Sequence, residues 1–136
     1  MAGYSGTPLA KKLGFKQGFR AGFVNRPRGF QQELGSLPRG VEIFLAPLPK
    51  PLDLIIFFAD SQQMLKREFP KLAHKLEKNG MLWIAWPKKA SGVATDLSDN
   101  SVRKIGLDAG LVDVKVCAVN EIWSGLKFVY RLEDRH

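Results

Sequence analysis

The sequence has 136 residues, a formal net charge of +8, 45% hydrophobic residues and 25% charged residues. This size and composition predict one globular domain over residues 1–136 and argue against a disordered or fibrous protein. The longest strongly apolar run, residues 54–59, is far shorter than the roughly 18 residues of a membrane-spanning helix. Residues 1–8 lack the order of a signal peptide, and a single cysteine permits no disulfide within the chain, so we expect a cytoplasmic protein without a membrane partner.

The first third of the chain predicts a helical lead-in over residues 1–18, followed by a strand and a short helix. Thr7-Pro8 is a typical helix start, and Gly14 is a typical helix stop. Residues 19–24 are expected to form the first strand. Residues 28–34 are expected to form a two-turn helix.

The middle of the chain contains its most apolar segment. Residues 41–45 predict a second strand, and residues 53–59 are apolar on both faces, which predicts a central parallel strand covered by helices on each side. Apolar residues then recur at helical spacing up to Asn79-Gly80, with a kink or a second helix expected at Pro70. Residues 81–86 predict the fourth strand.

The last third predicts one helix and two strands. Ser98 is a typical N-cap for a helix that ends at Gly110. Residues 111–119 alternate in polarity, which predicts a strand with one buried face, formed by Val112, Val114 and Val116. Residues 126–131 predict a final strand that pairs with it as an antiparallel hairpin.

This alternation of strands and helices predicts the α/β class. The expected architecture is a three-layer, Rossmann-like and methyltransferase-like sheet of about six strands, mostly parallel, with a C-terminal antiparallel hairpin.

Several segments resemble class I S-adenosylmethionine-dependent methyltransferases. Residues 12–18 are similar to the lead-in to the first strand of that family, and residues 53–56 and 76–84 are similar to its central part. Residues 106–111, followed by a hairpin, are similar to its C-terminal third. The resemblance implies a methyltransferase-like fold and S-adenosylmethionine as the candidate cofactor.

Two longer motifs resemble a family of small bacterial proteins of unknown function. The first is Tyr4-Ser5-Gly6-Thr7-Pro8-Leu9 with Lys11-Lys12-Leu13-Gly14. The second runs from Trp86-Pro87-Lys88-Lys89 through Ser91-Gly92-Val93-Ala94-Thr95-Asp96-Leu97. This resemblance implies a family without implying a mechanism.

The sequence departs from the methyltransferase pattern at the cofactor motifs. The turn after the first strand, residues 24–30, has one glycine, whereas a nucleotide-type cofactor needs several for its backbone amides to approach the ligand. The second strand ends in Leu45-Ala46-Pro47, without the acidic residue that holds ribose hydroxyls. These absences argue against an active methyltransferase.

Polar and basic side chains follow the first, third and fourth predicted strands. Because the carboxyl ends of parallel strands meet at one edge of a sheet, we expect a phosphate or carboxylate site there. The candidate ligand-binding residues are Asn25, Arg26, Arg28, Asp60, Ser61, Trp86, Lys88, Lys89, Ser91 and Thr95. The alternative interpretation is a set of solvated loop charges and helix caps.

No catalytic residue and no metal site can be named from the spacing of the sequence, and Cys117 is expected in the core. The favoured function is therefore a non-catalytic or weakly catalytic binding module for a small anionic ligand. One alternative is a divergent S-adenosylmethionine-dependent methyltransferase. Another is a nucleic-acid-binding accessory protein that uses the basic residues 11–39, because residues 1–40 contain seven basic residues and one acidic residue.

Overall fold

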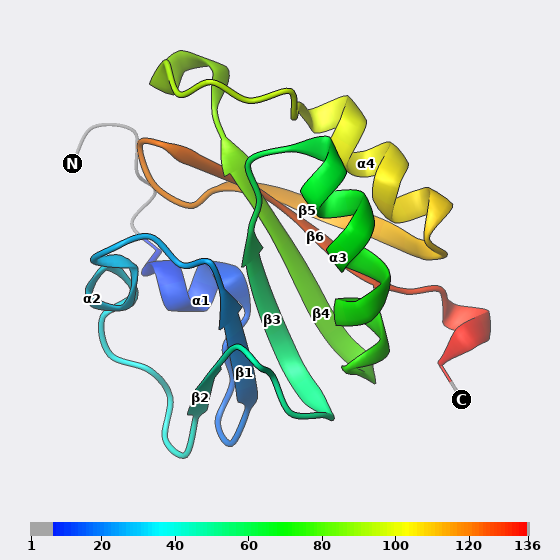
Figure 1. Ribbon diagram of the computed structural model, residues 1–136. Coiled ribbons are helices and arrows are strands. Elements are labelled where there is room, and N and C mark those ends of the chain that lie inside the picture. The colour runs from blue at the N-terminus through cyan, green and yellow to red at the C-terminus, as the bar shows by residue number, and fades with distance from the viewer. Residues whose placement is uncertain (1–6, 136) are drawn as a thin grey trace.

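The computed structural model describes residues 7–135, so Tyr4-Ser5-Gly6 of the first motif and the start of the expected lead-in lie outside the described residues. Within this range the elements, shown in Figure 1, are α1 (Leu9–Leu13), β1 (Arg20–Val24), α2 (Phe30–Leu34), β2 (Glu42–Leu45), β3 (Leu52–Phe58), α3 (Gln62–His74), β4 (Leu76–Pro87), the 3-10 turn η1 (Lys89–Ser91), α4 (Asp99–Asp108), β5 (Leu111–Ala118), β6 (Trp123–Tyr130) and the 3-10 turn η2 (Leu132–Asp134). No helix of residues 7–135 has the length and apolar character to cross a bilayer.

The strands form one sheet in the order β2-β1-β3-β4-β6-β5. The first four strands in this order are parallel, whereas β6 runs antiparallel to both β4 and β5. The predicted α/β fold, with its mostly parallel sheet and antiparallel C-terminal pair, is confirmed. β6 lies between β4 and β5, so the last strand of the chain is an interior strand of the sheet.

Helices cover both faces of the sheet, and β3 shows why its sequence is continuously apolar. Ile55 and Phe57 face the cluster that includes α3 and α4, while Leu54, Ile56 and Phe58 face the cluster that includes α1 and α2. All five are at most 2% exposed. A strand that is covered on both sides has no face for polar residues, as the sequence predicts.

The boundary between α3 and β4 differs from the prediction. Pro70 lies inside one continuous helix. The buried residues Leu65 and Phe69 precede the proline in the sequence and Leu72 follows it, so one buried stripe continues past Pro70. The helix ends at His74 and β4 begins at Leu76, so the expected helix end at Asn79-Gly80 is wrong. Those residues lie in an irregular start of β4, because Leu52 pairs with Leu76 whereas Leu54 pairs with Met81.

The predicted buried face of the fifth strand is also wrong. Val114 and Val116 are 53% and 52% exposed. The pairing of β5 with β6 shifts between Asp113 and Lys115, which leaves Val114 outside the regular register. Such a shift reverses the alternation, because neighbouring residues of a strand point to opposite faces. The shift also places Lys115 directly opposite Lys127.

The observed ends of three other elements differ from the predicted ends by one to three residues. α1 has Pro8 at its N-cap position instead of Thr7, and α2 begins at Phe30 instead of residue 28. β6 begins at Trp123, three residues before the predicted start. Helix and strand termini are the least determined part of a local sequence pattern.

Candidate functional site

The carboxyl ends of β1, β3 and β4 lie at the same edge of the sheet, and the ten candidate residues lie at these ends or in the segments that follow them. The structure separates them into three groups. One group lines a cavity beyond β4, a second lines a cavity beyond β1, and the remaining candidates, together with Thr95 of the first group, form contacts within and between loops and helices.

The first cavity, called the β4 pocket below, has a volume of about 630 Å³ and includes Trp86, Lys88, Lys89, Val93, Thr95 and Val116 in its lining. Trp86 is 5% exposed and belongs to the core beneath α3 and α4. Val93 and Val116 are large apolar side chains that remain about half exposed. The pocket therefore combines two lysines with an apolar wall.

The side chains of Lys88 and Lys89 have no hydrogen-bonding or ion-pair partner among residues 7–135. The backbone at Lys88 is held in place, because its N–H donates to the carbonyl of Ile122 at 2.7 Å. Gly92 then turns the chain with a φ of +78°, at the end of the 3-10 turn. The two lysines thus lie at the start of a loop whose backbone is fixed at Lys88, and their charges are available to a ligand.

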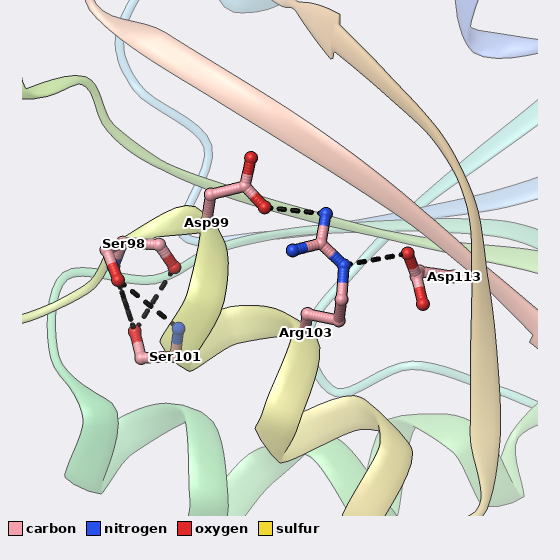
Figure 2. Close-up of polar contacts among 5 residues, drawn as sticks. All are labelled: Ser98, Asp99, Ser101, Arg103 and Asp113. Atoms are coloured by element: carbon pink, nitrogen blue, oxygen red, sulfur yellow. Dashed lines mark hydrogen bonds and ion pairs between the residues drawn. The ribbon is translucent and has the colours of Figure 1, made fainter.

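Asp99 is the acidic residue that lines the same pocket, and Arg103 holds its carboxylate (Figure 2). Arg103 Nη2 lies 2.6 Å from Asp99 Oδ1, and its Nε donates to Asp113 Oδ2 at 2.9 Å. The hydrogen bond to Asp113, with the negative charges of Asp99 and Asp113, raises the pKa of Arg103 despite partial desolvation. Arg103 therefore stays charged and joins the start of α4 to β5.

The N-termini of α3 and α4 are already occupied by groups of the chain itself. Ser61 accepts from the N–H of Met64 at 3.1 Å, and Asp96 Oδ1 accepts from the N–H of Gln62 at 2.8 Å. At α4, Ser98 and Ser101 form a reciprocal capping box (Figure 2). An anion at the start of α3 would have to compete with the carboxylate of Asp96.

The remaining hydroxyl candidates stabilise the loop after β4. Thr95 Oγ1 donates to the carbonyl of Asp60 at 2.6 Å and accepts from Leu97 N, while Ser91 Oγ donates to the carbonyl of Lys88 at 2.6 Å. The loop is thereby tied both to the end of β3 and to itself. These contacts, with the N-cap bond of Ser61, account structurally for the hydroxyls of Ser61, Ser91 and Thr95, whereas Asp60 takes part through its backbone carbonyl. The role of all four residues towards a ligand stays a prediction.

The candidates after β1 lie apart from the β4 pocket. Arg26 and Arg28 line a second open cavity of about 590 Å³, together with Gln31 and Gln32. Asn25 has a φ of +58°, and its amide lies 3.5 Å from the carbonyl oxygen of Phe58. The structure therefore groups the two arginines with each other and not with the two lysines.

Sequence reasoning missed Val116 and Ser124 as pocket residues. Both reach the pocket because β6 returns beside β4, where Ser124 pairs with Trp86. The sequence suggested a hairpin and contained no signal for which of its strands would lie against β4. Val116 was expected in the core, and the register shift in β5 exposes it.

Neither a protein-family profile nor a curated protein matches the sequence. The chain is similar in structure to a SAM-dependent methyltransferase from Aquifex aeolicus, with 17% identity, a TM-score of 0.62 and coverage of 87% of this chain and 85% of that one. It is similar to precorrin-6y C5,15-methyltransferase from Geobacter metallireducens GS-15, with 11% identity, a TM-score of 0.62 and coverage of 89% and 86%.

A third similar structure is magnesium protoporphyrin IX methyltransferase from Synechocystis PCC 6803 with bound SAM. It shares 12% identity at a TM-score of 0.58, with coverage of 90% of this chain and 74% of that one. At such low identity these likenesses establish a methyltransferase-like fold and leave function open. The resemblance of the two motifs to a bacterial family of unknown function stays a prediction.

The residues after β1 and β2 do not fit S-adenosylmethionine in the manner expected of this fold. The turn after β1 has one glycine, Gly29, at the N-cap position of α2, where backbone contacts to a nucleotide-type cofactor need several. β2 ends in Leu45, an apolar side chain that is 48% exposed, where an acidic residue would hold ribose hydroxyls. Residues 7–135 contain no cluster of three His, Cys, Asp or Glu side chains that could hold a metal ion.

Proposed function

We propose that this methyltransferase-fold chain is a binding module for a small anionic ligand with an apolar part, held in the β4 pocket. The observation that carries the proposal is the pair Lys88 and Lys89, which have no internal partner in the described chain and line a cavity with an apolar wall. Two ammonium groups favour a phosphate or carboxylate, and Trp86, Val93 and Val116 favour an adjoining apolar group.

The anchored loop supports the same proposal. Thr95 is bonded to the end of β3, and Asp96 is bonded to the start of α3 through Gln62, whose side chain also donates to the Asp96 carbonyl at 2.8 Å. A loop that is fixed before binding loses less conformational freedom when the ligand arrives. The pocket is therefore preorganised on one side by the loop and on the other by β4 and β6.

Thermal unfolding with phenyl phosphate, inorganic phosphate and benzoate tests this proposal. A ligand that binds only the folded state stabilises it by about 2.7 kcal/mol when its concentration is 100 times its dissociation constant. We expect phenyl phosphate to raise the Tm of the unmodified protein more than inorganic phosphate does. The double variant Lys88→Gln/Lys89→Gln should lose this rise.

The matched control is Arg26→Gln/Arg28→Gln, which removes the same charge from the cavity after β1. We expect the control to keep the full rise in Tm. Loss of the rise in the control, or the absence of any rise with all three anions, would overturn the β4 pocket as the binding site.

The second candidate function is S-adenosylmethionine-dependent methyl transfer, and the structural neighbours favour it over the anion-binding module as far as fold is concerned. Against it stand the single glycine of the turn after β1 and the apolar end of β2. S-adenosylmethionine and S-adenosylhomocysteine belong in the same thermal series. A saturable rise in Tm with either of them, unaffected by Lys88→Gln/Lys89→Gln, would support the methyltransferase over the binding module.

A further inference from the structure

Four lysines from distant parts of the chain meet on one face of the molecule. Lys115 of β5 and Lys127 of β6 are direct cross-strand partners. Lys115 Nζ donates to the carbonyl of Lys12 at 3.2 Å, and Lys12 Nζ donates to the carbonyl of Ala118 at 3.3 Å. These bonds attach the end of α1 to β5 and bring three ammonium groups into one neighbourhood.

The fourth lysine, Lys16, follows α1, and its positive charge is one of the causes that lower the pKa of Lys127. Burial is the first cause of the lowered pKa of Lys127, and the positive charges of Lys115 and Lys16 lower it further. Among residues 7–135, none of the four lysines forms an ion pair with an acidic side chain. Lys12, Lys16, Lys115 and Lys127 are called the four-lysine face below.

The four-lysine face lies on the side of the sheet away from α4. Lys127 Nζ is 5.9 Å from the centre of the Trp83 ring, and Trp83 belongs to the core cluster beneath α1 and α2. The neighbouring strand residue Phe128 points the other way, into the cluster with α4. Figure 1 shows α4 along one side of β5 and β6.

Like charges directly opposite each other on two strands destabilise a sheet, and no acidic partner offsets them here. A partner with regularly spaced negative charge would complement the surface. Lysines supply point charges that suit phosphates, whereas a protein-binding hot spot is typically built on exposed Trp, Tyr or Arg. On this side of the sheet the Trp83 ring beside Lys127 is 1% exposed, and the partly buried Trp123 packs edge-to-face on Phe58.

We propose that the four-lysine face binds the phosphodiester backbone of nucleic acid. The contacts would be to phosphates and not to base edges, so binding would depend on salt and little on sequence. Of the basic residues in 11–39, this face uses Lys12 and Lys16 alone. Arg26 and Arg28 line the cavity after β1, and Arg20 stacks on Phe44 with its guanidinium carbon 4.9 Å from the ring centre.

Fluorescence anisotropy with a labelled DNA duplex and a labelled single-stranded RNA, at several KCl concentrations, tests the proposal. Four phosphate contacts to duplex DNA predict a slope of about −3.6 for log K against log salt, or about 150-fold weaker binding between 50 and 200 mM. The variant Lys115→Gln/Lys127→Gln should halve the slope and reduce this loss to about twelvefold.

The matched control is Lys66→Gln/Lys71→Gln, which removes the same charge from exposed positions on α3. We expect the control to keep the slope of the unmodified protein. No binding to either nucleic acid at 50 mM KCl would overturn the proposal, and so would an equal loss in the control, which would mean that net charge alone is responsible. If Lys88→Gln/Lys89→Gln reduces the salt dependence of binding and Lys115→Gln/Lys127→Gln does not, the phosphates bind at the β4 pocket and the proposal is overturned.

Thermal unfolding of the Lys115→Gln/Lys127→Gln variant shows whether its folded state is intact. We expect its Tm to lie close to that of the unmodified protein, because relief of the like-charge pair opposes the loss of the hydrogen bond from Lys115 to the Lys12 carbonyl. One outcome would assign the weaker nucleic-acid binding to unfolding and overturn the proposal. In that outcome the variant has a lowered Tm, and its binding returns to that of the unmodified protein at a lower temperature, where the variant is folded.

Discussion

At the scale of single residues, Trp83 joins the first helix to the middle of the sheet. Its indole N–H donates to the carbonyl of Leu13 at 2.8 Å, across 70 positions of the chain. Leu13 is the last residue of α1, where helix carbonyls lack a partner within the helix. A single buried side chain therefore satisfies the end of α1 and fixes its position on β4.

Trp83→Phe should lower the free energy of unfolding by about 1–3 kcal/mol, because it leaves the buried Leu13 carbonyl without a donor and removes apolar volume. Urea denaturation followed by circular dichroism measures the change. Trp123→Phe is the control, because Trp123 packs edge-to-face on Phe58 in the same cluster and is only partly buried. An equal loss in both variants would contradict the role of the indole hydrogen bond.

Lys127 should make stability depend on pH in the alkaline range. Burial and the charges of Lys115 and Lys16 lower its pKa, so the folded state binds fewer protons than the unfolded chain. Stability contributed by this group therefore rises with pH through the folded pKa and levels off near the free lysine pKa of about 10.4. The ammonium lies at the outer limit of cation–π distance from Trp83, so that attraction is small.

Lys127→Gln should be more stable than the unmodified protein by about 0.2–1 kcal/mol at pH 7, with the difference shrinking towards pH 10. Urea titrations of both proteins from pH 7 to pH 10.5 check this. Burial raises the pKa of Cys117 and of Tyr130, which lowers stability at high pH in both proteins. Because the charge of Lys127 also acts on the Cys117 thiol, both proteins carry Cys117→Ser, so that the difference between them reports Lys127. A constant or widening difference would contradict the expectation.

At the scale of elements, α4 approaches the sheet through Gly106. A Cβ at this buried position would collide with the ring of Phe128 in β6, at Cε1. The ring of Phe128 also packs edge-to-face on Phe69 of α3, with centroids 5.1 Å apart. The missing side chain thus sets the distance at which α4 packs on β6.

Gly106→Ala should destabilise the protein by about 1–3 kcal/mol, although alanine favours a helix over glycine by about 1 kcal/mol, because the core is overpacked. Thermal and urea unfolding measure the effect. In a Phe128→Leu background the same substitution should cost less, because the obstructing ring atoms are gone. A cost that is unchanged in that background would rule out the clash as its cause.

The elements also show where local sequence is informative. The continuous apolar run of β3 and the Ser98 cap of α4 were predictable, because each depends on its own residues. The helix through Pro70 was not, since packing of Leu65, Phe69 and Leu72 outweighs the lost backbone bond. The exposed Val114 and Val116 depend on a register shift that only the pairing with β6 defines.

At the scale of the whole molecule, the sheet was predictable as a class and the candidate site only in part. Alternating strands and helices predict the α/β fold, and the carboxyl edge follows from parallel strands. Local sequence does not say that Arg26 and Lys88 line different cavities, or that Lys115 and Lys127 join Lys12. These groupings are set by strand order, which long-range packing decides.

The net charge of +8 should make stability depend on ionic strength. Screening shortens the range of repulsion from about 30 Å at 0.01 M salt to about 8 Å at 0.15 M, so the Tm should rise with added KCl. Calorimetry between 10 and 300 mM KCl measures the rise. It should be smaller in Lys115→Gln/Lys127→Gln, and a Tm that falls with salt would show that attractive ion pairs dominate.

The interior position of β6 has a consequence for synthesis. The ribosome makes β5 before β6, yet β5 pairs with β6 alone and β4 needs β6 along its outer edge. Until Trp123–Tyr130 leaves the exit tunnel, β4 has an uncovered edge and β5 has no partner strand, and open edges recruit strands from other chains. The sheet is therefore completed only after its last strand has been made, and we expect a chain whose translation stalls before residue 123 to be aggregation-prone.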